Sequence, residues 1–332
     1  MGPEFLRIAF DDQIFRRQPR GGISRYFQDL TVGLKASPGV GLQAIPRAQV
    51  VHATFYGGRP HKLKSNQKLV SSLFDLTPER HPEHFFLPQL RSPHGNKRGW
   101  LQASDLILSI SQASADDLSF FQPRLHAHVQ VIHLATGLGM VKPTVVQRLN
   151  NRRFWLLVGK RHAYKNGLTL LRALHRLLPS TSIPLLVCAG GGQWSRQEQQ
   201  WISQAMLSDQ ILQLPADDGE LAWLYRHAEA VLVPSMAEGF SLPLIEALVC
   251  NTPVLASDLE AHREVAGAYA ALLPALNAEA WAESLAAASH APFPSPKERL
   301  GEEQFTNLCS HYSMQRMVGE HLAAYRQLIA DC

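Results

Sequence analysis

Cysteine is scarce in this sequence, and no two cysteines stand close together. The 332 residues contain four, at Cys188, Cys250, Cys309 and Cys332, and none forms a Cys-x-x-Cys pair. A structural zinc site and a disulfide framework are therefore not indicated, and we expect a reducing compartment. Short-period repeats and low-complexity tracts are also missing, which excludes a solenoid.

Long apolar runs are missing as well. No stretch approaches the roughly eighteen residues that a membrane-spanning helix needs. The polar-interrupted start predicts no secretory signal, and the first five residues, MGPEF, resemble a cloning remnant. We therefore expect a cytoplasmic protein.

Charge is unevenly distributed along the chain, whose formal net charge is +4. Residues 1–150 carry 18 Lys and Arg against 10 Asp and Glu (+8), whereas residues 151–332 carry 14 against 18 (−4). A basic half fits an anionic acceptor or peripheral contact with an anionic membrane at its inner face, and Arg16, Arg17 and Arg20 form the densest cluster. No nucleic acid partner is expected, because the basic residues are not interleaved with aromatic ones.

Short apolar runs alternate with amphipathic stretches through both halves, which is typical of parallel βαβ units. We expect an α/β protein with two doubly wound, Rossmann-like domains, and a ligand site where the carboxyl ends of the strands converge. The predicted strands are 6–10, 41–45, 50–55, 69–74, 105–110 and 128–133, then 154–159, 184–189, 211–214, 230–234, 254–257 and 271–273.

The predicted domain boundaries follow from a break in this pattern. Residues 136–153 contain glycine, proline and clustered Arg and Asn with little apolar periodicity, so we take them as a linker. The expected parts are an N-terminal domain over 6–135, a second domain over 154–312, and a C-terminal packing helix over 313–332 with Ser313 as its N-cap.

The most informative segment is LVPSMAEGFSLPLIE, residues 232–246. It predicts a buried strand, a turn, and a helix that opens near Ser241 with Pro243 in its first turn. Glu238 precedes that helix and Glu246 lies on it, so two carboxylates accompany the amides of the helix N-terminus. This combination suits a polyhydroxylated, phosphate-bearing ligand.

A second segment, WLLVGKRHAYK, covers residues 155–165. A strand ends at Gly159, and Arg161 and Lys165 follow before a helix that begins near Asn166. Cations at the carboxyl end of a strand suit a diphosphate, whose charge they neutralise without a metal.

Two glycine-rich turns are weaker signals. Gly21 and Gly22 precede a helix that we expect Ser24 to cap, and residues 189–192 (AGGG) follow a predicted strand without the G-x-G-x-x-G spacing of a dinucleotide site. The histidines at 81, 84, 126 and 128 lack ligand partners at metal-binding spacing, so no metal site is predicted.

In this order, the segments resemble the GT4 family of retaining glycosyltransferases. Glu238 to Glu246 is similar to the family's E-x7-E signature, and Gly159, Arg161 and Lys165 are similar to its phosphate-binding residues. GGISRYF, residues 21–27, resembles the subgroup that builds capsules, O-antigens and exopolysaccharides. The resemblance implies the GT-B architecture, in which two Rossmann-like domains face each other across a cleft. It also implies that residues 6–135 form the acceptor-side domain and residues 154–312 the nucleotide-sugar-binding domain.

The resemblance also implies roles for individual residues. Arg161 and Lys165 would hold the donor diphosphate, Glu246 the ribose hydroxyls, and Glu238 the donor sugar. The remaining donor-binding residues would be Gly21, Gly22, Asp75, Gly239, Phe240, Ser241 and Leu242. One departure stands out: the subgroup commonly has His-Asp where this chain has Phe74 and Asp75, so Asp75 or a histidine from elsewhere would substitute.

The resulting hypothesis is a metal-independent, retaining hexosyltransferase without a cofactor. It would move glucose or mannose from a UDP- or GDP-sugar to a saccharide or lipid-linked saccharide acceptor in polysaccharide biosynthesis. The alternatives are a sugar-nucleotide epimerase or a phosphorylase of similar fold, or a non-catalytic sugar-nucleotide-binding protein.

Overall fold

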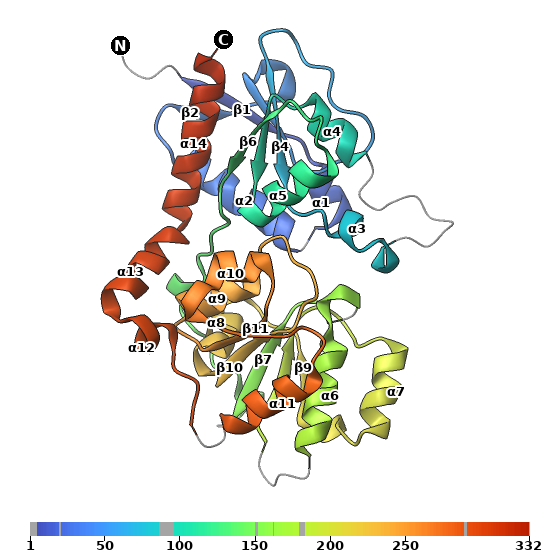
Figure 1. Ribbon diagram of the computed structural model, residues 1–332. Helices are drawn as coiled ribbons and strands as arrows, with labels where there is room; N and C mark the ends of the chain where they lie inside the picture. The colour runs from blue at the N-terminus through green and yellow to red at the C-terminus, as the bar shows by residue number, and fades with distance from the viewer. Residues whose placement is uncertain are drawn as a thin grey trace. The chain divides into compact units, whose positions relative to one another are not determined.

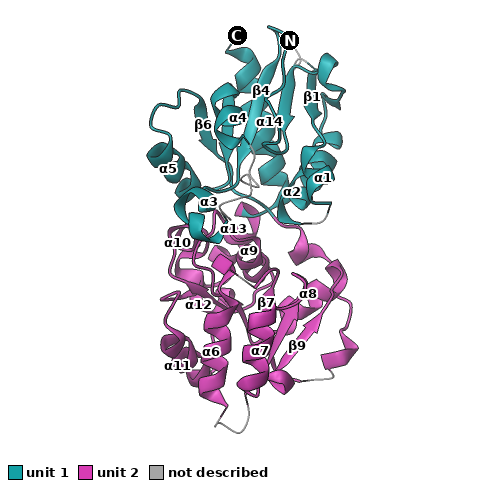
Figure 2. Ribbon diagram, turned by 90° about the vertical axis from the view of Figure 1, so that its right-hand side faces the viewer, with its two compact units in different colours: residues 1–135, 312–332 teal, residues 136–311 magenta. Residues whose placement is uncertain are grey.

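The computed structural model describes residues 5–19, 21–85, 96–149, 152–161, 163–178, 183–288 and 291–331 (Figure 1). The chain divides into two compact units (Figure 2). Unit 1 comprises residues 1–135 and 312–332, and unit 2 comprises residues 136–311. The end of the chain therefore belongs with its beginning.

Unit 1 is built on a six-stranded parallel sheet in the order β2-β1-β3-β4-β5-β6. All six strands predicted for the first half are present. Because the strand order reverses between β1 and β3, these two strands form the topological switch point of the sheet. The strands are β1 (Leu6–Phe10), β2 (Val40–Leu42), β3 (Val50–Ala53), β4 (Lys68–Leu73), β5 (Leu106–Ser109) and β6 (His128–Val131).

The helices of unit 1 include one that comes from the end of the chain. Helix α14 (Met314–Ala330) packs beside α2 (Gly22–Lys35), and its N-cap is Ser313, as predicted. The expectation that Ser24 caps α2 was wrong. The helix begins at Gly22, so Ser24 lies in its first turn, where its hydroxyl donates to the carbonyl of Gln18. The other helices are α1 (Gln13–Arg17), α3 (Thr77–Arg80), α4 (Lys97–Ala103) and α5 (Gln112–Phe121).

Unit 2 also has six parallel strands, in the order β12-β11-β10-β7-β8-β9, with its switch point between β7 and β10. The six strands predicted for the second half are present: β7 (Phe154–Val158), β8 (Leu185–Ala189), β9 (Ile211–Leu214), β10 (Ala230–Val233), β11 (Val254–Ser257) and β12 (Ala271–Leu273). The helices are α6 (Gly167–Leu177), α7 (Arg196–Gln204), α8 (Asp218–His227), α9 (Leu242–Val249), α10 (Glu260–Ala266), α11 (Ala278–Ala287), α12 (Pro296–Leu300) and α13 (Glu302–His311).

The segment that the sequence marked as a linker counts with unit 2. It contains two short 3-10 helices, Leu138–Met140 and Gln147–Leu149. Its backbone is tied to α8, because the Arg226 guanidinium donates to the carbonyls of Gly139 at 2.8 Å and Val141 at 3.0 Å. No helix in the described part of the chain is both long enough and apolar enough to cross a membrane.

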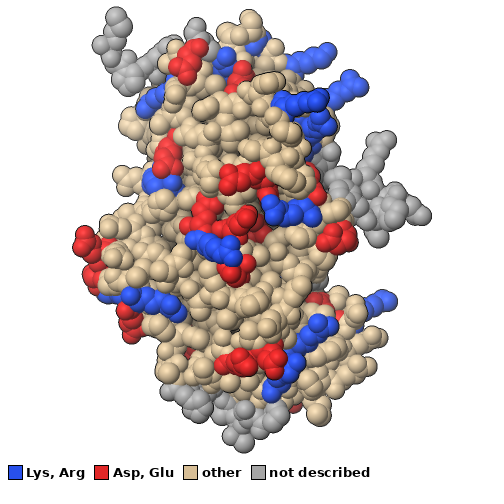
Figure 3. Space-filling view, in the orientation of Figure 1, with Lys and Arg blue, Asp and Glu red and all other residues tan. Residues whose placement is uncertain are grey.

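The two units differ in charge. Unit 1 has 18 Lys and Arg against 12 Asp and Glu, and unit 2 has 14 against 16, so their formal charges are +6 and −2. On the face in Figure 3, basic side chains gather at the upper right, over unit 1, whereas acidic and basic side chains lie close together over unit 2.

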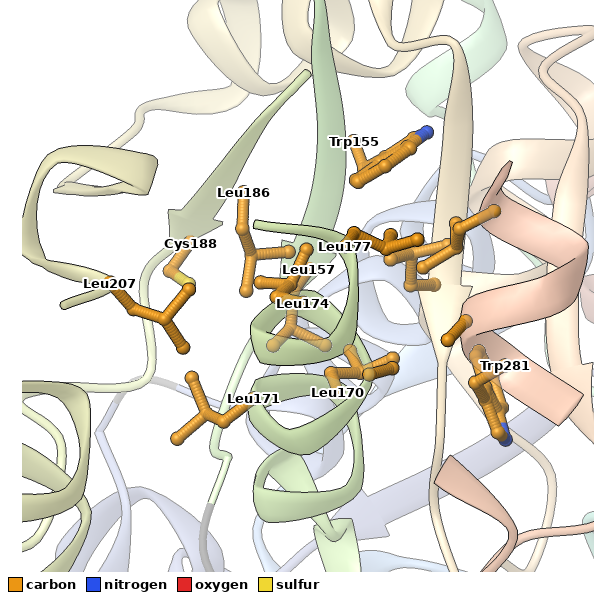
Figure 4. Packing of buried hydrophobic residues seen from close by; sticks show 14 of the residues in the cluster. Trp155, Leu157, Leu170, Leu171, Leu174, Leu177, Leu186, Cys188, Leu207 and Trp281 are labelled. Atoms are coloured by element: carbon orange, nitrogen blue, oxygen red, sulfur yellow. The ribbon is translucent and has the colours of Figure 1, made fainter. Parts of the chain in front are cut away.

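The core of unit 2 fixes the sheet that carries the strand ends. Helix α6 buries Leu170, Leu171, Leu174 and Leu177, an apolar stripe at helical spacing, against the sheet. Strands β7 and β8 are buried on both faces and therefore read as nearly continuous apolar runs. Trp281 of α11 packs into the same cluster (Figure 4).

Candidate active site

Two loops at the switch point of unit 2 bring the predicted residues together. The loop after β7 turns at Gly159, where φ is +86°, and leads through a 3-10 turn (Ala163–Lys165) to the N-cap of α6 at Asn166. The loop after β10 covers residues 234–241 and ends at Ser241, the N-cap of α9. Since β7 and β10 are neighbouring parallel strands, both loops lie at one edge of the sheet.

Lys165 and Glu238, which are 73 residues apart in the sequence, form a close ion pair across these loops. The Lys165 ammonium donates to both Glu238 carboxylate oxygens, at 2.6 and 2.8 Å, and the Ser235 hydroxyl donates to Oε1 at 2.6 Å. Burial alone would raise the pKa of Glu238, but Lys165, nearby His262 and the two hydrogen-bond donors together lower that pKa. The carboxylate therefore stays ionised at neutral pH.

Arg161 is buried rather than presented to solvent, with 2% of its surface exposed. Its Nη1 donates to the carbonyls of Gly159 at 3.0 Å and Gly190 at 2.7 Å, and its guanidinium carbon lies 5.0 Å from the Trp194 ring centre. The guanidinium forms no ion pair with a carboxylate of the described residues, and its Nε lacks a hydrogen-bond partner there. An uncompensated buried cation at a strand end favours an anion nearby.

The AGGG segment explains how Arg161, in the loop after β7, reaches the loop after β8. Gly190, Gly191 and Gly192 all have positive φ. A Cβ built on Gly191 would lie 1.9 Å from the Gly159 carbonyl oxygen, so only glycine permits this approach of the two backbones.

Glu246 is held in the interior by a tyrosine. The Tyr225 hydroxyl donates to Glu246 Oε2 at 2.7 Å, and only 6% of Glu246 is exposed. The structure therefore places Glu246 on the first turns of α9, as predicted, with one carboxylate oxygen fixed by α8.

Ser241 has an unusual conformation at the start of α9. Its φ is +84°, a left-handed value that costs a non-glycine residue free energy and that clusters at functional sites. Its hydroxyl is buried and has no hydrogen-bond partner within the described ranges. Gly239 and Phe240 precede it in the loop, and Leu242 is the first residue of the helix.

Sequence reasoning missed His262 on α10. The residue is fully buried, and its Nδ1 lies 2.8 Å from the Ser257 carbonyl, so Nδ1 carries the proton. Burial lowers the pKa of His262, although Glu238 opposes that effect, so the ring is neutral. Its position beside Glu238 arises from the pairing of β10 with β11, which no local sequence spacing reveals.

The other predicted donor-binding residues lie in unit 1. Gly21 is the N-cap and Gly22 the first residue of α2. Asp75 follows β4, and its carboxylate accepts from the backbone amide of Thr77 at 3.0 Å. Phe74, which stands where a histidine was expected, is buried with its ring edge against Tyr26.

Across the described ranges, no group of three or more His, Cys, Asp or Glu side chains is arranged to hold a metal ion.

Comparison with known proteins points to one family. Residues 144–305 match the family model of glycosyl transferases group 1. This part of the chain is similar to the GT4-type glycosyltransferases. The matched region contains both loops of the site, so Lys165 and Glu238 lie within it.

Relatives and solved structures agree with this assignment. The chain is 27% identical, over 55% of its length, to the O-antigen chain mannosyltransferase RfbU of Salmonella typhimurium, of which it spans 50%. Sucrose-phosphate synthase from Thermosynechococcus elongatus superposes with a TM-score of 0.75 at 17% identity, covering 98% of this chain and 100% of that one. Anabaena HepE, solved with UDP and glucose, superposes with a TM-score of 0.62 at 17% identity, covering 98% of both chains. The structural matches establish a Rossmann-like GT-B fold for this chain.

Proposed function

We propose that this protein transfers a hexose from a nucleoside diphosphate sugar to a saccharide acceptor. The observation that carries the proposal is the Lys165–Glu238 pair at the switch point of unit 2, within the region that matches group 1 glycosyltransferases, with the Arg161 cation buried in the loop after β7. Positive charge at this edge suits a diphosphate, and carboxylates suit sugar hydroxyls.

The donor is proposed to be a UDP- or GDP-hexose carrying glucose or mannose. The relatives support both sugars, because RfbU is a mannosyltransferase and HepE was solved with UDP and glucose. In this model Glu238 and the loop residues 239–242 receive the sugar, and Glu246 receives the ribose. Gly21, Gly22 and Asp75 are proposed to contribute from unit 1.

The proposed chemistry proceeds with retention and without a metal ion. The bond between the anomeric carbon and the diphosphate oxygen breaks, the acceptor hydroxyl bonds to the same face of that carbon, and its proton passes to the departing phosphate. Lys165 and Arg161 stabilise the negative charge that develops on the leaving group. Since Lys165 is paired with Glu238 in the structure, we expect the diphosphate to share the ammonium with that carboxylate.

The acceptor is proposed to be a saccharide or lipid-linked precursor of a polysaccharide, in line with the O-antigen relative. We place the reaction in the cytoplasm, with unit 1 in peripheral contact with an anionic membrane surface because of its +6 charge.

A donor screen followed by a transfer assay tests the proposal. Thermal unfolding is measured with UDP-, GDP-, ADP- and dTDP-sugars, because a ligand at about 100 times its Kd stabilises the fold by about 2.7 kcal/mol. We expect one UDP- or GDP-hexose to raise Tm and to be transferred to saccharides with retained configuration, equally well in EDTA. Conversion of the donor sugar without an acceptor would instead indicate an epimerase, and binding with neither transfer nor donor hydrolysis would indicate a non-catalytic protein.

A further inference from the structure

Unit 1 has a switch point of its own, and a second polar cluster lies there. Asp11 follows β1 directly and Thr54 follows β3, and these two strands are the neighbours between which the strand order reverses. In doubly wound sheets, ligands bind outside the carboxyl ends of such strands. Unit 2 has its candidate active site at the equivalent place, so the cluster in unit 1 is positioned for a second ligand.

Asp11 is a buried carboxylate that organises this edge. Its Oδ1 accepts from the Thr54 backbone amide at 2.9 Å and the Thr54 hydroxyl at 2.5 Å. Its Oδ2 accepts from Gln13 Nε2 at 2.5 Å and from His61 Nε2 at 2.9 Å. Within the described ranges, His61 is the sole cation-capable side chain paired with Asp11.

His61 is held in one orientation with one ring nitrogen unused. Because a carboxylate only accepts, Nε2 carries a proton and donates it to Asp11, and Nδ1 is the ring nitrogen left for a ligand. The ring edge packs against Trp100, with the ring centres 5.2 Å apart, and 29% of the side chain is exposed. Nδ1 has no hydrogen-bond partner in the described part of the chain.

This geometry selects the chemistry of the ligand. A ring nitrogen backed by a buried carboxylate lies in a negative local field, so a neutral hydroxyl, which can donate or accept, fits it better than a phosphate anion. Asp11 acts as the positioning residue, since its four other hydrogen-bond contacts fix the carboxylate that orients the ring.

We propose that His61, oriented by Asp11, binds a hydroxyl of the acceptor saccharide. The proposal rests on the proposed glycosyl transfer, and it places the acceptor at the switch point of unit 1. Neither His61 nor Asp11 belongs to the donor-binding residues described above.

A direct binding measurement uses the full chain with isotope-labelled histidine rings. The His61 signal is assigned by its loss in His61→Gln. Methyl α-mannopyranoside and methyl α-glucopyranoside are then titrated, with inorganic phosphate as the anionic probe. We expect a glycoside to shift the His61 signal saturably while phosphate does not. A shift with phosphate alone, or with neither probe, would overturn the proposal.

The kinetic arm separates binding from structure. We expect His61→Ala to lower kcat/KM for the acceptor about tenfold, as for loss of one hydrogen bond, while donor hydrolysis stays within about twofold. His61→Gln, which can donate to Asp11 and still present an acceptor oxygen, should recover part of the loss. The matched control is His128→Ala, an exposed histidine at the amino end of β6.

Two outcomes distinguish this proposal from its premise. His61→Ala could lower transfer, donor hydrolysis and Tm together. That result would show that His61 supports the fold and does not bind the acceptor. If the wild type transfers no sugar but glycosides still shift the His61 ring, the proposed function fails while the hydroxyl site stands.

Discussion

At the scale of single residues, the two cations of the candidate active site differ in exposure and in hydrogen-bond partners. Lys165 is partly exposed, with 26% of its side chain accessible, and its ammonium can turn from Glu238 to a ligand. Arg161 is buried and holds the carbonyls that end β7 and β8. Lys165 contacts a side chain instead, the Glu238 carboxylate.

Both cations should affect activity and stability, for different reasons. We expect Lys165→Ala to lower kcat/KM about a hundredfold or more. It should also lower Tm, because the Glu238 carboxylate, with only 10% of its side chain exposed, loses its cation. Arg161→Ala should lower both, since two buried carbonyls lose their donor. Steady-state kinetics and thermal unfolding of both variants check the prediction. Near-normal kcat/KM in both would rule out the phosphate assignment.

Sequence spacing predicted the residues that share one loop or helix, such as Glu238 and Glu246. It missed His262 and the pairing of Asp11 with His61, which are 50 residues apart. Those residues meet because parallel strands bring their carboxyl ends to one edge, and the sequence contains no local signal for the side chains that meet there.

At the scale of elements, the close approach of two loops depends on one glycine. Gly191 has a φ of +72° and its Cα faces the backbone of Gly159, whereas Gly192 has a φ of +78° and open space around it. Both glycines therefore need a left-handed backbone, but only Gly191 has no room for a Cβ atom.

We expect Gly191→Ala to destabilise unit 2 by more than about 3 kcal/mol and to abolish activity, because the methyl group would displace the loop after β7. Gly192→Ala is the matched control and should cost only about 1 kcal/mol for the left-handed backbone. Urea unfolding measures both. Similar costs for the two variants would contradict the steric argument.

A buried hydrogen-bond chain attaches α14 to unit 1. His52 of β3 lies between the Tyr325 hydroxyl (2.6 Å from Nδ1) and the Ser72 hydroxyl (2.8 Å from Nε2). Tyr26 continues the chain to His321 Nε2 at 2.6 Å, and His321 Nδ1 donates to the Met317 carbonyl. Burial lowers the pKa of His321 to about 4 and the pKa of His52 well below its ordinary value.

Both histidines are therefore neutral in the folded state, and acid should destabilise unit 1. The unfolded chain binds protons near pH 6.5 and the folded chain does not, so stability falls as the pH drops from about 7 to about 4. For His321 alone the loss is roughly 3 kcal/mol. Urea midpoints across this range check the trend, which His321→Gln should flatten and the exposed-site control His128→Gln should not. An unchanged slope in His321→Gln would contradict it.

At the scale of the whole molecule, the order of strands and helices followed from the sequence. Each buried parallel strand is a short apolar run between turn residues, so all twelve were predictable. The attachment of α14 to α2 was not, because the contact between Tyr26 and His321 spans 295 residues. The sequence predicts the apolar stripe of α14, but it does not indicate on which unit that stripe packs.

The charge difference between the units is also a property of the whole chain. Unit 1 carries +6 and unit 2 carries −2. Arg16 and Arg17 lie at the end of α1 in unit 1. Arg16 pairs with Asp12 at 2.5 Å, although 78% of its side chain is exposed. Arg17 lies over the Phe55 ring. Arg20, the third residue of the predicted cluster, lies outside the described residues.

We expect this cluster to support salt-sensitive binding to anionic vesicles. A basic residue near an anionic leaflet contributes about 1 kcal/mol to membrane binding. Replacing all three arginines by glutamine should therefore weaken binding by up to about a hundredfold. The loss should fall below that limit because Arg16 is already paired with Asp12. Co-sedimentation with anionic and neutral vesicles at low and high salt measures the effect. The matched control replaces three exposed arginines of unit 2, Arg172, Arg176 and Arg196, and should bind like the wild type. Both variants lose the same net charge, so equal weakening would show that total charge, and not the position of the cluster, governs binding. Equal sedimentation with both lipids and at both salt concentrations would exclude membrane attachment through unit 1.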